Sequence, residues 1–160
     1  MSALNPYAKY LDGHKPETIL AATAHELAAL LAAIGDEKAA MAPAPGKWSP
    51  AEVICHLADC EIVFAFRLRQ TLAEDGPTIQ PFDQDRWAAT YVGVPAALAL
   101  EAFRALREWN LRLITTAPPE AAQRTMTHPE RGTMTFLTVV ETMAGHDLNH
   151  LEQLRRIAAA

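Results

Sequence analysis

The segment FLTVVETMAGHDLNHLEQLRRI (residues 136–157) decides the fold class. At about 100° per residue its large apolar side chains fall on one face, which is the pattern of a helix packed against a core. We expect this helix to begin near Thr133 or Thr135 and to end near Ile157. The apolar face consists of Phe136, Val139, Met143, Leu154 and Ile157.

Three more segments have helical periodicity, and no segment has the clear alternation of a strand. The first is expected over Pro16–Ile34, the second from Pro50 to about Glu74, and the third from Pro95 to a point before Pro118. On the third helix we expect an inward face of Ala99, Phe103, Leu106, Asn110 and Leu113.

These helices predict an all-α fold, namely a four-helix bundle with long loops in one domain over residues 1–160. A length of 160 residues suits a single domain, and a hydrophobic content of 50% is ample for its core. The second helix has the clearest start, because Ser49 can cap it, Pro50 suits its first position and Glu52 completes a capping box.

Composition narrows the class of partner and the compartment. Nineteen acidic residues against fourteen Lys and Arg give a net charge of −5, which disfavours nucleic acid as the main partner. No signal peptide and no uninterrupted apolar run of membrane-spanning length are visible, so we expect no membrane association. Cys55 and Cys60 would point to different faces of one helix, so a disulfide is not expected and a reducing cytoplasm fits best.

Two histidines interrupt the apolar face of the last helix. His146 and His150 are one turn apart on the same side, a spacing that lets two imidazoles bind one metal ion. The residues between them lack the glutamate base of zinc proteases, which excludes that class. His56, at the edge of the inward face of the second helix, can supply a third ligand if the two helices are antiparallel. The alternative is a set of hydrogen-bonded core histidines without metal.

Two polar residues are the candidate catalytic groups near these histidines. Gln153 follows His150 by one turn on the same face and is expected in the pocket. Arg67 lies on the His56 side of its helix and can hold an anionic substrate, or else extend along the surface.

Other residues have weaker signals. Asp59, Glu61 and Asp147 are candidates to orient a ligand imidazole, with solvated surface charges as the alternative. Cys60 faces inward, either as a further ligand or reactive thiol or, more often, as a small buried apolar residue. Trp87 and Tyr91 are candidates for pocket walls. His14 and His25 have no matching partner, and for His128 we expect the surface rather than the pocket rim.

The second helix also carries apolar residues opposite its core face, namely Cys55, Ile62 and Phe66. A helix that is apolar on its core face and on the opposite face needs other parts of the protein to cover both faces. The loops can provide that cover, but we expect a homodimer interface.

Two motifs resemble the DinB-like superfamily, the DinB/YfiT-like metalloenzymes. They are KWSPAEVICHLAD (residues 47–59) and AGHDLNHLEQL (residues 144–154). The separation of their histidines, 146 − 56 = 90 residues, is typical of that family, and the similarity covers about Lys47 to Ile157. The resemblance implies a four-helix bundle, a divalent metal on His56, His146 and His150, and a frequent homodimer.

The resemblance does not imply one reaction. The family includes transferases of low-molecular-weight thiols, an isomerase and metal-dependent hydrolases, so we expect a metal-dependent enzyme acting on a small molecule. A metal on three imidazoles can activate a thiol for S-transfer or water for hydrolysis, and the family favours transfer slightly. Zinc or nickel is expected first, with iron or manganese as alternatives. The competing hypotheses are a non-catalytic metal-binding or stress-related dimer and a plain helical bundle with buried histidines.

Overall fold

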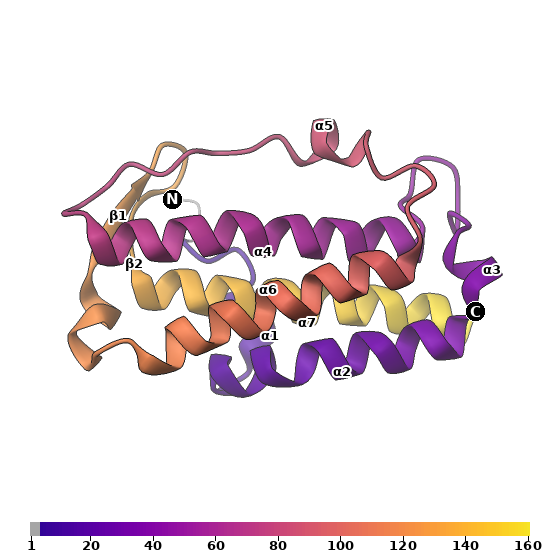
Figure 1. Cartoon of the computed structure of the whole chain (residues 1–160), viewed down its shortest axis with the longest axis horizontal. Coiled ribbons are helices and arrows are strands. Elements are labelled where there is room, and N and C mark those ends of the chain that lie inside the picture. Colours follow the sequence, from indigo (N-terminus) through magenta and orange to yellow (C-terminus); the bar gives the residue numbers. More distant parts are fainter. Residues whose placement is uncertain (1–3) are drawn as a thin grey trace.

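The computed structural model describes residues 4–160. Its body is formed by four long helices, α2 (Pro16–Ile34), α4 (Pro50–Ala73), α6 (Ala96–Thr116) and α7 (Phe136–Ala159). These helices lie where the sequence predicts them, so the four-helix bundle is confirmed (Figure 1). The shorter elements are α1 (Ala8–Leu11), α3 (Asp36–Ala39), α5 (Gln84–Ala88) and the 3-10 helix η1 (Pro119–Gln123).

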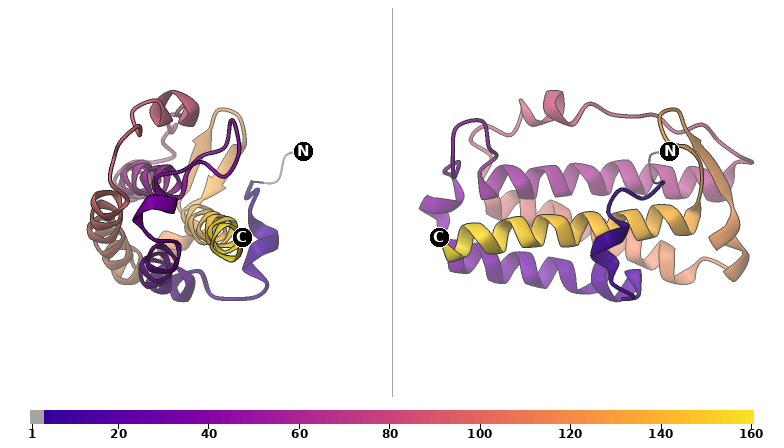
Figure 2. Two further views of the ribbon diagram at one scale, coloured as in Figure 1. Left: turned by 90° about the vertical axis from the view of Figure 1, so that its right-hand side faces the viewer. Right: turned by 180° about the vertical axis from the view of Figure 1, so that it is seen from behind.

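The order of the helices in space explains the longest connection. Seen end-on, α4 and α2 occupy opposite corners, and α6 and α7 each contact both of them (Figure 2). Helices α4 and α6 run in the same direction, antiparallel to α2 and α7 (Figure 1). The chain must therefore return along the whole bundle between α4 and α6, and this return carries α5. Because α4 and α7 are antiparallel neighbours, His56 can meet the histidines of α7.

The predicted start of α4 is confirmed in detail. The Ser49 hydroxyl accepts a hydrogen bond from the Glu52 backbone N–H at 3.3 Å, and the Ser49 N–H donates to the Glu52 carboxylate at 2.7 Å. Such a capping box satisfies two N–H groups that a helix start leaves without partners. Thr135 caps α7 similarly, accepting from the Thr138 N–H at 3.1 Å. The two helices that carry the predicted histidine ligands therefore have fixed starting points.

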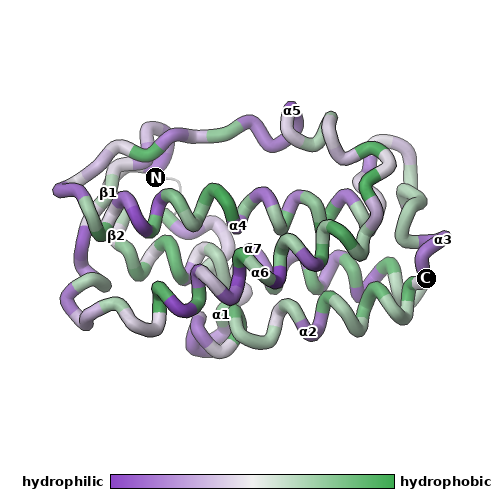
Figure 3. The backbone as a smooth tube through the Cα atoms, viewed as in Figure 1, coloured by the Kyte–Doolittle hydropathy of each residue, from purple (hydrophilic) through white to green (hydrophobic). Residues whose placement is uncertain are grey.

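Apolar and polar segments alternate along the long helices (Figure 3), and the apolar ones line the bundle interior. The buried face of α6 differs from the expected one. It runs through Arg107 and Ile114, whereas Leu106 and Leu113 are only partly buried. Helix α2 is long and apolar enough to cross a membrane by length and composition alone, yet in the bundle it buries Leu20 and other residues against its neighbours.

The expectation of no strands is wrong. Strands β1 (Thr125–His128) and β2 (Gly132–Thr135) form an antiparallel hairpin before α7, with Met126 opposite Met134. Thr127 also exchanges backbone hydrogen bonds with the long return, donating to Pro77 O at 2.8 Å and accepting from Ile79 N at 2.9 Å. Strands of four residues are too short for periodicity to reveal, and these strands depend on that neighbouring segment.

Candidate metal centre

Three imidazoles from α4 and α7 converge inside the bundle. The Nε2 atom of His146 lies 3.0 Å from Nε2 of His56 and 3.1 Å from Nε2 of His150. One nitrogen from each ring lies within 4.8 Å of those from the other two, and all three residues are buried. The structure thus brings together the three residues predicted as ligands.

The protonation of these rings suits metal binding. Burial, followed by the nearby His150, lowers the pKa of His56 to about 4. Burial also lowers the pKa of His146 well below its usual value, and it lowers the pKa of His150 despite the opposing effect of Gln153. Neutral imidazoles are therefore expected at pH 7, and the neutral ring is the form that binds metal.

Gln153 fixes the orientation of one ligand. The Nδ1 atom of His150 donates to the Gln153 side-chain oxygen at 2.9 Å, because that oxygen can only accept. The neutral ring then carries its proton on Nδ1, which leaves the lone pair of Nε2 directed at the other two histidines. Gln153 was expected to line the pocket. Instead it acts on His150 from outside the cavity described below.

The separations between the His146 nitrogen and the other two ligand nitrogens fit a shared cation. With metal–nitrogen bonds of about 2.0–2.1 Å and bond angles of about 90–110°, two ligand nitrogens lie about 2.8–3.4 Å apart. The observed separations of 3.0 and 3.1 Å fall in this range. The site thus fits a divalent metal held on one side, with its other side open to the cavity.

Aromatic rings shield the cluster. The Trp48 ring packs against His56 at a centroid distance of 4.9 Å, and the edge of Tyr7 meets His146 at 5.1 Å. Tyr7 can approach because residue 145 is glycine, since a Cβ at that position would lie 2.6 Å from the Tyr7 carbonyl oxygen. Sequence reasoning missed Tyr7. The available signal was Gly145, because a glycine inside a predicted helix indicates that another part of the chain approaches closely.

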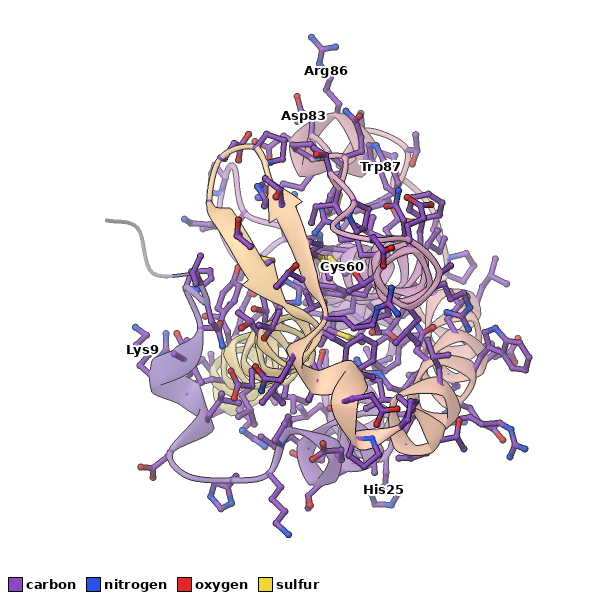
Figure 4. All side chains as sticks on the ribbon, turned by 90° about the vertical axis from the view of Figure 1, so that its left-hand side faces the viewer. Lys9, His25, Cys60, Asp83, Arg86 and Trp87 are labelled. Atoms are coloured by element: carbon purple, nitrogen blue, oxygen red, sulfur yellow. The ribbon has the colours of Figure 1, made fainter. Side chains whose placement is uncertain are left out.

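A cavity of about 90 Å³ adjoins His56 and His146. Its wall includes Arg67, as expected, and Cys60. The Cys60 sulfur lies 3.6 Å from His56 Nε2, inside the molecule (Figure 4), but it is not one of the clustered ligands. Burial raises the pKa of Cys60, so its thiol is protonated near neutral pH. The remaining walls are Tyr7, Phe64, Phe82, Gln84, His128, Arg131, Met134, Val139 and Thr142.

Three expectations for loop residues are corrected. His128, expected at the surface, is 5% exposed at the end of β1 and lines the cavity. Trp87 and Tyr91 do not line it. Trp87 packs on Phe82 and projects from α5 (Figure 4), and Tyr91 is buried against Trp48. The long return still contributes to the wall through Phe82, because the adjoining hairpin holds that segment over α4.

The three carboxylates expected to orient the imidazoles have other partners. Glu61 and Asp147 are buried and form ion pairs with Arg107 at 2.7 and 2.6 Å. Asp59 accepts a hydrogen bond from the Tyr91 hydroxyl at 2.6 Å. The two buried carboxylates and Arg107 thus join α4, α6 and α7 beside the metal ligands.

A larger cavity of about 560 Å³ lies at the other end of α4. Its wall contains Ser49, Glu52 and Asp36, and the first two are already engaged in the capping box. It contains no histidine and no cysteine. The smaller cavity, which adjoins the clustered imidazoles, is therefore the candidate site.

Comparisons with known proteins identify the family. The model of the DinB superfamily matches residues 19–154, so the chain belongs to this superfamily. A protein of Oceanobacillus iheyensis named "Putative metal-dependent hydrolase" is 31% identical over 110 residues, which are 68% of this chain and 64% of that protein. A second protein of that organism with the same description is 23% identical over 123 residues, which are 76% of this chain and 71% of that protein. The chain thus spans slightly less than two thirds of the first relative.

The solved structure of YfiT from Bacillus subtilis has the same fold. YfiT is described as "a probable metal-dependent hydrolase with an unusual four-helix bundle topology". The TM-score is 0.79 and the identity 20%, over 88% of this chain and 84% of YfiT. Identity at this level shows the shared bundle alone.

Proposed function

We propose that the protein is a metal-dependent hydrolase of small molecules, with one divalent ion bound by His56, His146 and His150. The observation that carries the proposal is the convergence of three buried Nε2 atoms at 3.0 and 3.1 Å. The names of the Oceanobacillus relatives support hydrolysis. Zinc or nickel is proposed first, since three imidazoles and an open side suit either, with iron and manganese as alternatives.

A bound divalent ion would lower the pKa of water and supply a nucleophile near neutral pH. The chain's own residues prepare the site for that chemistry. Gln153 holds His150 in the ligating tautomer. Trp48 and Tyr7 cover two of the rings, and Phe64 adds an apolar wall, so bulk water has limited access. Electrostatic interactions are stronger in such a site than in water.

Thiol S-transfer, the other reaction expected from the sequence, uses the same three ligands and stays a prediction. The two reactions are separated by their products. Hydrolysis consumes water and needs no thiol, whereas transfer consumes one equivalent of thiol for each electrophile. Assays of ester and amide panels for hydrolysis, and of alkyl halides and epoxides with a low-molecular-weight thiol for transfer, therefore distinguish them.

Metal analysis tests the proposal directly. Untagged wild-type protein should contain about one transition-metal ion per chain, and His146→Ala/His150→Ala should contain none. The matched control is His25→Ala, because His25 is exposed on α2 and outside the cluster. Turnover by the metal-loaded protein should be lost in His150→Ala. Wild-type protein that stays metal-free after incubation with zinc, nickel and manganese would overturn the proposal.

A homodimer is also proposed, on the basis of exposed apolar residues. Ile62 and Phe66 of α4 are 49% and 62% exposed, and Trp109 of the neighbouring α6 is 62% exposed. Cys55, expected on the same face, is buried and does not contribute. Light scattering that shows a monomer at micromolar concentration would contradict this proposal.

A further inference from the structure

Three basic side chains line the cavity that adjoins the metal ligands. Arg67 comes from α4, His128 from the end of β1, and Arg131 from the turn of the hairpin. They belong to segments about 60 residues apart in the sequence, and the hairpin brings them together. The same cavity is lined by His56 and His146.

Within residues 4–160 the two arginines have no acidic partner. Neither Arg67 nor Arg131 takes part in an ion pair, unlike Arg107, and no Asp or Glu lines the cavity. Arg67 donates one hydrogen bond, from Nη2 to Gln80 O at 2.9 Å. Its Nε is enclosed by the protein and has no hydrogen-bond partner. A partly buried guanidinium without an acidic partner is costly, and an anion in the cavity would offset that cost.

The basic groups also repel one another. Burial lowers the pKa of Arg67, and the nearby Arg131 lowers it further. Burial, then Arg131 and Arg67, lowers the pKa of His128, and the exposed Glu130 only partly opposes this effect. The His128 Nδ1 atom accepts the Glu130 N–H at 3.1 Å, so a neutral ring carries its proton on Nε2 and can donate it. An anion in the cavity would relieve the repulsion and accept these donors.

The position of Arg67 relative to the three histidines defines how a small molecule would lie in the cavity. His56 and Arg67 are 67 − 56 = 11 residues apart on α4, which is three turns and about 16 Å along the axis. They are nearly in phase, and helical side chains lean toward the N-terminus, so Arg67 leans toward His56. A cavity of about 90 Å³ is small compared with drug-binding pockets of roughly 300–1,000 Å³. The ligand is therefore compact, with its charge at one end.

We propose that the cavity binds a small substrate bearing a carboxylate or phosphate group, which Arg67 and Arg131 hold while its reacting bond is directed at the three histidines. The paired N–H donors of a guanidinium group match the oxygen spacing of both carboxylate and phosphate. This inference rests on the proposed function for the fate of the substrate, but recognition of the anion needs only the arginines.

The test compares butyrate with butyramide, which have nearly the same shape and differ in charge. Binding to metal-free protein is followed by ¹H–¹⁵N NMR titration in a buffer without carboxylate or phosphate, and inorganic phosphate is titrated separately. Butyrate or phosphate should perturb the Arg67 and Arg131 signals, and butyramide should not. Saturation by phosphate alone would identify a phosphate-bearing ligand, and saturation by butyrate alone a carboxylate.

Two variants and one control complete the test. Arg67→Gln and Arg131→Gln should each weaken anion binding about tenfold or more, as expected for loss of a charge-assisted hydrogen bond. Arg131 is in a turn, so its replacement should not disturb folding. Arg86→Gln is the control, because Arg86 is 87% exposed on α5 and outside the cavity (Figure 4). Equal binding of butyrate and butyramide, or unchanged affinity in both cavity variants, would overturn the inference.

The result is independent of the metal. Anion binding should persist in His150→Ala, which loses a metal ligand outside the cavity wall and keeps both arginines, and metal content should persist in Arg131→Gln. Loss of metal binding with retained anion binding would reject only the proposed function. Retained metal with no anion binding would reject only this inference.

Discussion

Replacing Arg107 with methionine should strongly destabilise the bundle. The guanidinium is 3% exposed and contacts Asp147 at 2.6 and 3.1 Å, Glu61 at 2.7 Å and the Leu20 carbonyl at 3.0 Å. Methionine has a similar length but no charge, so Glu61 and Asp147 would remain buried without a cation. Removing one partner of a buried ion pair costs about 3–5 kcal/mol. That is a fifth or more of the roughly 5–15 kcal/mol that stabilises a typical domain.

Urea unfolding followed by circular dichroism at pH 7.5 measures the effect. The free energy of unfolding of metal-free Arg107→Met should fall by about 3–5 kcal/mol. Arg104→Met is the matched control, since Arg104 is exposed on the same helix and should change stability by less than about 0.5 kcal/mol. Arg107→Met/Glu61→Gln should be more stable than Arg107→Met, because one unpaired charge is removed. A loss below about 1 kcal/mol in Arg107→Met would refute the reasoning.

Three further predictions concern the metal centre. In metal-free protein burial lowers the pKa of His56 to about 4 from 6.5, so the contribution of His56 to stability is fully present above pH 6.5 and falls by about 3 kcal/mol toward pH 4. Urea unfolding across this range should show a smaller loss in His56→Leu, and equal losses would contradict the assignment. Gly145→Ala should cost about 1–3 kcal/mol, because its Cβ would meet the Tyr7 carbonyl oxygen at 2.6 Å, and an unchanged melting temperature would exclude that contact. Gln153→Leu should weaken zinc affinity about 10–100-fold in a competition titration, and unchanged affinity would mean that His150 needs no such support.

The parts of the fold that the sequence predicts are those with strong local signals. Ser49, Pro50 and Glu52 specify the start of α4 by themselves. The two histidines of α7 stand out because a helix face that should be apolar carries them one turn apart. His56 could be added only through its position near an inward face and the family motif, and the antiparallel arrangement of α4 and α7 brings it into place (Figure 1).

The parts that the sequence does not predict depend on distant partners. Arg107 belongs to a buried face only because Glu61 and Asp147 neutralise it from two other helices. The carboxylates of this group were expected to reach the imidazoles, since a helix wheel shows which face a residue shares but not which cation lies opposite. The hairpin likewise forms against the long return, so His128 becomes buried through contacts that no local pattern contains.

The cavity wall combines residues from long helices with residues from connections, and the two groups differ in how readily they can be substituted. The imidazoles are anchored in the middle of two long helices, whereas Phe82, Gln84 and Arg131 come from connections between helices. Connections tolerate insertions and substitutions far better than packed helices do. Under the proposed function, a chimera that receives another relative's return segment or hairpin turn should therefore keep its metal while its choice of substrate changes. Exchange of these two connections would therefore alter the cavity wall without rebuilding the three-histidine cluster.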